Sequence, residues 1–417
     1  MSRLWRAGAR FGWALSMTGV SAVGRRLSGR DDAFDHAGRS VQRALAVDAV
    51  PDPPPTAPRA WPAPEDWFAS DASRAAWQRA ERGLVDGATE LLASARAVLP
   101  TAGAPARAVC AWEQKLMAYG TFRRAATIAP ARPFAERLAI ACKAPVAERL
   151  WLIEGLGYDH VTRGDDLPIG DHPAAALPTL HTGAGLARAR RRLHDDLDAS
   201  ALARATLDDA RRTPRPDLGE IRVETLGFAV RLLAPDRIAT LEDALGAAVR
   251  IGAPAPEASA ALTLPVARAL LWHGIGRAAY FARDRAVTPE ALRRLAAASA
   301  TPKAAAANAV AGLAWAAAMV HLLAPSPAPQ VIDDALRAWR VAPADHAAIA
   351  DGVASASLLW LQGVGETAAY RALADPRGRR WRTLVSEPVA HARAQHRDDA
   401  LARPGTLYRF AGRGGAP

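Results

Sequence analysis

The chain has 417 residues, of which half are hydrophobic, and it carries a formal net charge of +11. This length allows two or three ordinary domains or one large repeat domain with a sizeable core. Nearly all of the positive charge is arginine interspersed with acidic residues, without a lysine-rich tail or a basic motif with interleaved aromatics, so we expect no nucleic-acid partner. Two cysteines, Cys110 and Cys142, are too few for a disulfide framework and favour a reducing cytoplasm.

Residues 1–64 are predicted to be a basic N-terminal segment that ends in a proline-rich linker, PDPPPTAPRAWPAP. Its apolar part is too short to span a membrane, and it is a weak candidate for a targeting signal. Trp5, Phe11 and Trp13 lie among arginines, a composition suited to a membrane surface. We favour a segment docked on the body of the protein, with peripheral membrane contact as the alternative.

Helical periodicity then continues over residues 65–403, which we take as one domain, and residues 404–417 form a C-terminal tail. Alanine, leucine and arginine favour helices and β-branched residues are sparse, so the predicted class is all-α. The predicted helices span 72–98, 106–127, 133–142, 145–162, 174–194, 219–234, 237–251, 262–283, 289–299, 303–323, 328–340, 344–373 (with a break near Gly363) and 383–401.

Residues 304–324 are uncharged and long enough to cross a membrane. Their content is mostly alanine, which favours lipid only weakly, and Asn308 and His321 lie among them. The sequence therefore favours a buried helix of a large α-helical protein.

A glycine motif recurs along the helical domain. Its copies read IEGLGY, HTGAGLARAR, ETLGFAVRLL, HGIGRAAYF, NAVAGLAWAAA and ADGVASASLLW. With Gly157, Gly185, Gly227, Gly276, Gly312 and Ala354 taken as equivalent points, the repeat is about 40 residues long, the length of a helical hairpin. This predicts an inner helix that recurs six or seven times, each copy followed by a more variable outer helix.

The paired glycines need an explanation, because a glycine inside a helix costs about 1 kcal/mol relative to alanine. A phosphate-binding glycine loop requires a preceding strand, and nothing before His181 reads as one. The simpler explanation is that the glycines let neighbouring helix backbones approach closely, and that this packing offsets the lower helix stability. Helices that converge on an axis need small residues there, so we predict repeated helical hairpins in an α/α toroid or a tightly curved α-solenoid.

Carboxylates and imidazoles stand just before the glycines, in Glu154, His181, Glu224 and His273. At equivalent heights around a ring they could serve acid–base chemistry, and Arg277 could bind a carboxylate, phosphate or enolate oxygen. These five residues are the predicted catalytic site. The alternatives are helix caps and, for Arg277, a salt bridge to Glu224. No tight metal motif is present, so neither a metal nor a cofactor is predicted.

Five of the motifs resemble, in the same order, the glycine motifs of a bacterial family catalogued as domain of unknown function 1702. The resemblance covers residues 145–370, and members of that family are encoded beside enediyne polyketide synthases. The residues that keep the pattern are Gly183, Ala184, Gly185, Ala187, Gly276, Arg277, Ala278 and Phe281, whereas Thr225, Ala229 and Val310 depart from it. The resemblance implies a divergent member with a role in secondary metabolism and supplies no mechanism.

The expected function is therefore the biosynthesis of an enediyne or polyketide-type metabolite, in the cytoplasm or at a membrane. The protein would bind or act on a large apolar small-molecule intermediate inside the helical toroid. A non-catalytic binding or assembly protein at a membrane surface is the alternative. An isoprenoid-type cyclase shares the toroid architecture, but the chain has no convincing acid motif for it.

Overall fold

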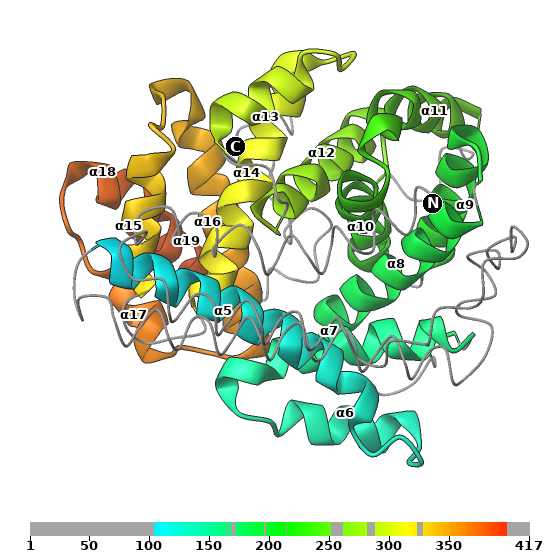
Figure 1. Ribbon diagram of the computed structural model, residues 1–417, viewed down its shortest axis with the longest axis horizontal. Helices are drawn as coiled ribbons and strands as arrows, with labels where there is room; N and C mark the ends of the chain where they lie inside the picture. The colour runs from blue at the N-terminus through cyan, green and yellow to red at the C-terminus, as the bar shows by residue number, and fades with distance from the viewer. Residues whose placement is uncertain are drawn as a thin grey trace, which may run out of the picture. The chain divides into compact units, whose positions relative to one another are not determined.

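The computed structural model describes residues 104–164, 166–167, 172–195, 197–213, 215–251, 262–281, 288–322 and 328–397. Within these ranges the regular elements are all helical and no strand occurs, which confirms the predicted all-α class (Figure 1). The N-terminal segment 1–64 with Trp5, Phe11 and Trp13, and the tail 404–417, lie outside the described residues.

The chain divides into two compact units, Met1–Gly120 and Thr121–Pro417. Of the first unit the structure describes residues 104–120, which belong to helix α5 (Ala104–Arg124). The six copies of the glycine motif and all five predicted site residues belong to the second unit.

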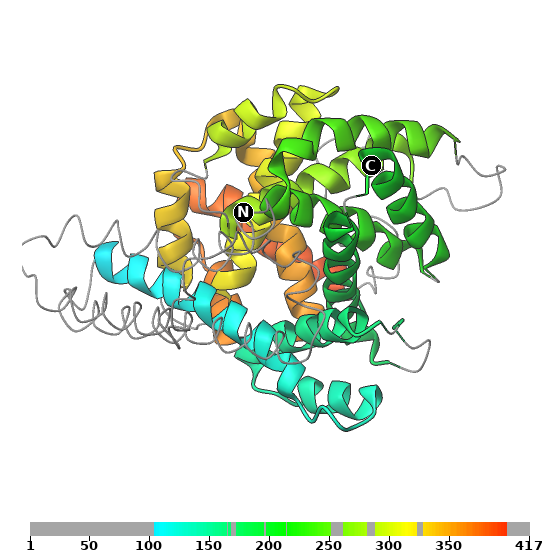
Figure 2. The ribbon, with the colours of Figure 1, turned by 45° about the vertical axis from the view of Figure 1, so that its right-hand side comes forward.

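Six helices of the second unit carry the motif and pack side by side in chain order (Figures 1 and 2). They are α7 (Val146–Thr162), α8 (Leu177–His194), α10 (Pro216–Leu233), α12 (Leu264–Phe281), α14 (Pro302–His321) and α16 (His346–Gly363). The arginine-rich copy, HTGAGLARARRRLH, lies entirely within α8, so its glycines belong to a helix and not to a loop. We call these six the inner helices.

Shorter helices pack against the inner ones. They are α6 (Phe134–Cys142) on α7, α9 (Ala199–Arg212) on α10, α11 (Ile238–Ile251) on α12, and α13 (Pro289–Ala296) and α15 (Ala328–Ala338) on α14. The predicted alternation fails between α7 and α8, where the described residues hold only the 3₁₀ turn η2 (Ala174–Ala176). Helix α9 was not among the predicted helices; the Asp198 side chain caps it by accepting a hydrogen bond from the Ala201 backbone N–H at 2.7 Å.

The remaining elements are short or lie after the inner helices. They are the 3₁₀ turns η1 (Ala125–Thr127), η3 (Pro235–Arg237) and η4 (Pro343–Asp345), the helices α17 (Ala368–Ala374), α18 (Arg379–Trp381) and α19 (Glu387–Arg397), and the π-helical turn η5 (Arg382–Ser386). Helix α16 ends at Gly363, as the predicted break requires, and it packs on α19.

Helix α14 is the apolar segment that could be mistaken for a membrane span. By length and composition it could cross a membrane, and it is the one such helix in the described part of the chain. Of its most apolar stretch, 83% is buried inside the protein. That burial agrees with the expectation of a core helix.

The motif glycines bring the backbones of the inner helices into contact. An added Cβ would lie 1.8 Å from the Glu154 carbonyl oxygen at Gly183, and 1.9 Å from the Glu224 carbonyl oxygen at Gly274. Such distances are far below van der Waals contact, so no side chain fits there. The predicted close approach of backbones is confirmed. Gly183 and Gly274 face carbonyl oxygens of the preceding inner helix, whereas the second glycine of a pair, as at Gly276, faces a carbonyl oxygen of the following one.

The same contacts correct the register of the repeat. Gly312 lies against the His273 carbonyl oxygen, with an added Cβ 1.9 Å away, just as Gly274 lies against that of Glu224. Gly312 is therefore equivalent to the first glycine of each pair and not, as predicted, to Gly276. Ala314 occupies the second position in α14.

Contacts also join the last inner helix to the first. A Cβ added at Gly363 would lie 2.3 Å from Leu150 Cδ2 in α7. Gln362 Nε2 donates to the carbonyl oxygen of Ala174 in η2 at 3.5 Å.

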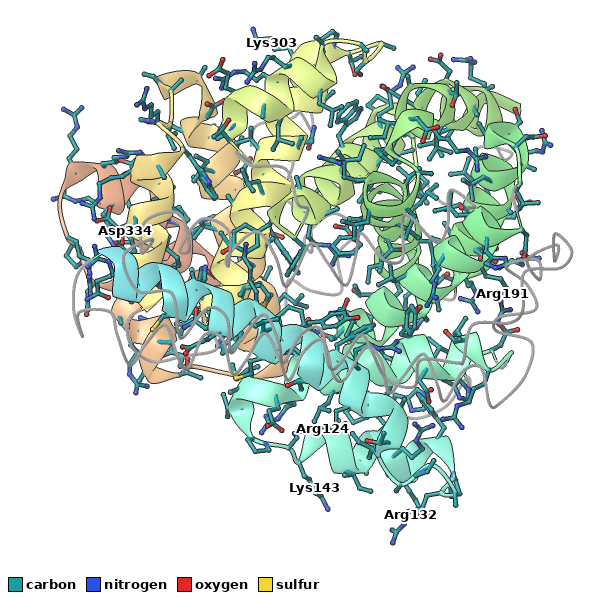
Figure 3. All side chains as sticks on the ribbon, in the orientation of Figure 1. Arg124, Arg132, Lys143, Arg191, Lys303 and Asp334 are labelled. Atoms are coloured by element: carbon teal, nitrogen blue, oxygen red, sulfur yellow. The ribbon has the colours of Figure 1, made fainter. Side chains whose placement is uncertain are left out.

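Charged side chains such as Arg132, Lys143 and Lys303 extend into solvent from the surface of the unit (Figure 3).

Candidate acid–base site

The glycine contacts fix the position of the residue before the first glycine site of each inner helix. Glu154, Glu224 and His273 precede Gly155, Thr225 and Gly274, respectively. Their carbonyl oxygens are the atoms that face the glycine of the next inner helix in the row. The three side chains therefore leave their helices at equivalent heights, as the sequence predicted.

Glu224, His273 and Arg277 form a buried polar cluster between α10 and α12. Glu224 Oε1 lies 3.0 Å from Arg277 Nε and 3.3 Å from His273 Nδ1. Glu224 and His273 are fully buried, and Arg277 is 3% exposed. Because a carboxylate can only accept, His273 donates through Nδ1–H to Glu224. The predicted salt bridge between Arg277 and Glu224 is present.

Aromatic rings surround the guanidinium of this cluster. The Arg277 Cζ atom lies 4.5 Å from the ring centre of Phe228 and 5.4 Å from that of Trp315. His273 meets Trp315 edge-on, with ring centres 6.3 Å apart. Cation–π contacts of this kind stabilise a cation that has been removed from water.

Glu154 brings a second carboxyl group to the same region from α7. Burial raises the pKa of Glu154 to about 7, the Arg277 charge opposes that rise, and the Glu224 charge adds to it. The side chain keeps an intermediate exposed fraction, but the surrounding protein desolvates the carboxyl strongly. A carboxyl group with a pKa near 7 exchanges its proton readily at neutral pH.

His273 is held in its neutral form. Burial lowers its pKa below the ordinary value, while the hydrogen bond to Glu224 works in the opposite direction. With a neutral imidazole, the cluster of Glu224, Arg277 and His273 has balanced charges, and Glu154 is the group that adds or removes a proton.

The second carboxylate oxygen of Glu224 differs from the first in its contacts. Glu224 Oε2 is buried and finds no donor within the described part of the chain. Since an unsatisfied buried carboxylate oxygen is costly, this atom is an acceptor site for a hydroxyl or N–H group. The arrangement offers an acid or base (Glu154), a cation that can bind an oxyanion (Arg277), and an open acceptor (Glu224).

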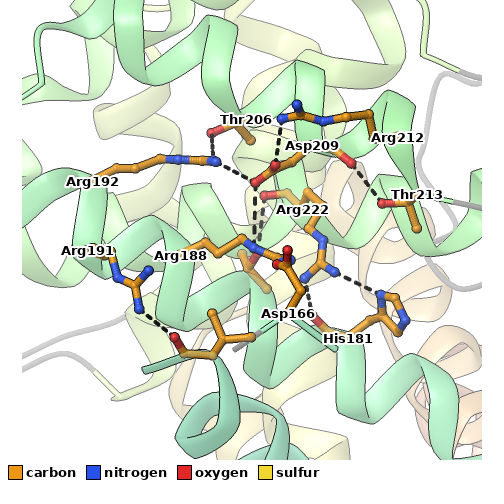
Figure 4. A network of polar contacts seen from close by, with 12 residues as sticks. Asp166, His181, Arg188, Arg191, Arg192, Thr206, Asp209, Arg212, Thr213 and Arg222 are labelled. Carbon is orange, nitrogen blue, oxygen red and sulfur yellow. Dashed lines mark hydrogen bonds and ion pairs between the residues drawn. The ribbon is translucent and has the colours of Figure 1, made fainter. Parts of the chain in front are cut away.

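His181, the fifth predicted site residue, does not join this cluster. It lies two residues before Gly183, so Thr182 occupies the position equivalent to Glu154, and a shift of one residue turns a side chain by about 100° around a helix. Thr182 donates to the Pro178 carbonyl oxygen at 2.9 Å. His181 faces Arg222 of α10 instead, with 3.0 Å between Nδ1 and Arg222 Nη2 (Figure 4).

Two aspartates also stand directly before a glycine: Asp351 in the copy ADGVASASLLW and Asp86 in VDGATELLAS, a fainter first copy of the motif. Asp351 occupies the position equivalent to Glu154 on α16 and is partly exposed. Asp86, in the faint first copy, lies outside the described residues.

The sequence analysis missed Phe228 and the Tyr280–His321 pair. Phe228 follows Glu224 by four residues, the spacing that puts two side chains on one face of a helix, and this signal could have found it. Tyr280 Oη lies 2.5 Å from His321 Nε2, and burial raises the pKa of Tyr280 well above its ordinary value. This pair extends the polar surface between α12 and α14 beyond Arg277.

No group of three or more histidine, cysteine, aspartate or glutamate side chains arranged to hold a metal ion is found among the described residues. Comparison of the chain with family models, curated proteins and solved structures finds no match.

Proposed function

We propose that the chain is a protein of bacterial secondary metabolism, of the enediyne or polyketide type, that catalyses a proton transfer on a large apolar intermediate. The observation that carries the proposal is the convergence of Glu154, Glu224, His273 and Arg277 from three inner helices. Catalytic acids and bases need pKa values near the working pH, and the raised pKa of Glu154 meets that need.

The proposed architecture is an α/α toroid, in which the six inner helices form a closed ring around the site. The succession of contacts from α7 to α16 supports a curved row of helices, and the contact between Gly363 and Leu150 supports its closure. An open, tightly curved solenoid is the competing arrangement. The aromatic rings of Phe228 and Trp315 beside Arg277 suit an apolar ligand.

In the proposed mechanism, Glu154 gives or takes the proton. Arg277, held by Glu224 and by two aromatic faces, would bind the oxygen on which negative charge develops. His273 orients Glu224 through its Nδ1–H. The assignment to secondary metabolism, in the cytoplasm or at a membrane, rests on the motif resemblance to domain of unknown function 1702, as a divergent member.

A non-catalytic binding or assembly role is the second candidate. Glu224, His273 and Arg277 are buried and already paired with one another, which also suits a purely structural cluster. In that case the Glu154 carboxyl would matter for stability and not for turnover.

The test compares metabolites by mass spectrometry in strains that carry the wild-type gene, a deletion, Glu154→Gln or Glu136→Gln. Glu136 is an exposed helical glutamate of α6 and serves as the matched control. We expect the deletion and Glu154→Gln to accumulate the same intermediate, and Glu136→Gln to match the wild type.

Two results would contradict the proposed function. If the deletion changes the metabolites but Glu154→Gln does not, the protein acts without this carboxyl group and the binding role is correct. If the deletion leaves every secondary metabolite unchanged, the assignment to secondary metabolism is wrong.

A further inference from the structure

The arginine-rich end of α8 contacts α9 and α10, away from the acid–base cluster. Figure 4 shows its polar network, which contains Arg188, Arg191, Arg192, Arg212 and Arg222 but only two carboxylates, Asp166 and Asp209. Positive charge is therefore in excess within this network, and how each arginine is balanced decides what the network can bind.

Asp209 is already engaged by two of the arginines. Its Oδ2 lies 2.5 Å from Arg192 Nη2, and its Oδ1 lies 3.2 Å from Arg212 Nη2. Arg188 Nε reaches Asp209 only at 3.9 Å. The one shielded carboxylate of the network is thus used by Arg192 and Arg212.

Arg222 is a buried cation without a carboxylate in contact. It is 5% exposed, and within the described residues no aspartate or glutamate lies at ion-pair distance from it. Its guanidinium donates to the His181 carbonyl oxygen and to His181 Nδ1, both at 3.0 Å, and its buried Nε finds no acceptor in the part of the chain that the structure describes. Desolvation, followed by the charge of Arg188, lowers the pKa of Arg222 to about 9. A buried cation without a carboxylate partner favours the binding of an anion.

Arg188 has a counter-ion that can be replaced. Its Nη2 lies 2.6 Å from Asp166 Oδ1, but the Asp166 side chain is 92% exposed. Exposed ion pairs contribute little to stability because water and salt compete with them. The Asp166 carboxylate therefore marks a position that the anionic group of a ligand could take.

His181 holds the Arg222 guanidinium in place. Arginine cannot accept a hydrogen bond, so His181 Nδ1 is the acceptor and its proton sits on Nε2. Burial, together with the charges of Arg222 and Arg188, lowers the pKa of His181 to about 3 and keeps the ring neutral. The ring therefore accepts a hydrogen bond from Arg222 and supplies no charge to neutralise it.

We propose that Arg188 and Arg222, with Arg222 held by His181, form a binding site for a small anionic group, a carboxylate or a phosphate, which displaces Asp166 from Arg188. The ligands are side chains of α8 and α10, and the motif glycines of α8 take no part. The site is separate from the acid–base cluster and does not depend on the function proposed for it.

Titration calorimetry of the full chain at low ionic strength tests the site, with inorganic phosphate in one arm and acetate in the other. Three variants accompany the wild type: Arg188→Gln, Asp166→Asn and, as the matched control, Arg212→Gln, whose exposed arginine pairs with the same network. Circular dichroism checks that each variant is folded.

We expect binding of at least one anion, and the tighter of the two identifies the ligand as a phosphate or a carboxylate. Arg188→Gln should weaken it roughly tenfold to a hundredfold, because a charge-assisted hydrogen bond is lost. Asp166→Asn should bind as tightly as the wild type or up to about fivefold more tightly. Arg212→Gln should bind like the wild type.

Any of three results would overturn the site. They are the absence of binding by either anion to the wild type, equal affinity of the wild type and folded Arg188→Gln, and weaker binding by Asp166→Asn.

Discussion

Glu154 and Glu224 occupy the same position of the repeat, yet their surroundings differ. Glu224 contacts a guanidinium and an imidazole N–H, whereas burial, as the largest cause, raises the pKa of Glu154 to about 7. Two carboxyl groups in unequal environments can divide the roles of proton carrier and permanent charge. Both glutamates were predicted from the sequence because each directly precedes a glycine site. Residues at equivalent positions of repeated helices direct their side chains the same way.

The pKa of Glu154 predicts how stability depends on pH. The folded-state pKa lies above the unfolded-state value, so the folded protein holds the proton more tightly. The resulting stabilisation is complete below about pH 4.5 and is lost as the pH rises to about 7. Urea unfolding at pH 5 and pH 8 should show the wild type losing about 1 to 3 kcal/mol relative to Glu154→Gln.

An equal difference between the two proteins at both pH values would contradict this environment for Glu154. Glu136→Gln again serves as the control: it removes an exposed carboxylate and keeps Glu154, so its free energy of unfolding should follow that of the wild type at both pH values.

His181 shows the limit of motif reading at the residue scale. Its place beside the HTGAGL glycines suggested a member of the ring, but a displacement of one residue aims it at Arg222. A helix converts a small offset in sequence into a large change of direction. Arg222 itself carries no motif signal, because it is one arginine among many.

At the scale of elements, the inner helices are held together by backbone contact. The cost of glycine in a helix predicted this contact from the sequence. The position of Gly312 was misjudged because α14 keeps one glycine of the pair, with Val310 two residues before it and Ala314 two residues after it, so the spacing alone does not assign it to either site. Only the carbonyl oxygen that each glycine faces distinguishes the two sites.

Substituting glycine with alanine should have opposite effects at two helical positions. At Gly183 the new Cβ would lie 1.8 Å from the Glu154 carbonyl oxygen, so α7 and α8 must separate, and we expect a loss of about 1 to 3 kcal/mol. At Gly246 of α11 the nearest atom is the flexible Arg268 Nη2 at 3.4 Å, and alanine should raise stability by up to about 1 kcal/mol. Urea unfolding measures both, and a change of the same sign in the two variants would refute the backbone contact.

At the scale of the second unit, the contact between α16 and α7 is the feature by which the two proposed arrangements, a closed toroid and an open solenoid, can be tested. In an open row of repeats the terminal helices unfold first, because each helix is stabilised only by its neighbours. In a closed ring, amides of α7 and α16 should exchange with solvent as slowly as those of α12. Amino-acid composition predicted the helical class, but no spacing in the sequence indicates that Leu150 meets Gly363.

Hydrogen exchange with mass spectrometry checks this closure. Leu150→Ala should remove the contact, lower the free energy of unfolding by about 2 to 5 kcal/mol, and speed exchange in both α7 and α16. Faster exchange in α7 alone, or fraying of both helices in the wild type, would favour the open solenoid.

The contact between α8 and α10 departs from the glycine pattern. This departure predicts which substitutions can occur together in related sequences. Thr225 stands where the other inner helices carry their first glycine or its equivalent, and a Cβ added at Gly185 would lie 2.4 Å from its hydroxyl oxygen. One side chain fits between these helices, but two do not. Among descendants of a common ancestor, positions 185 and 225 should therefore change together: a side chain at either one should be accompanied by glycine at the other.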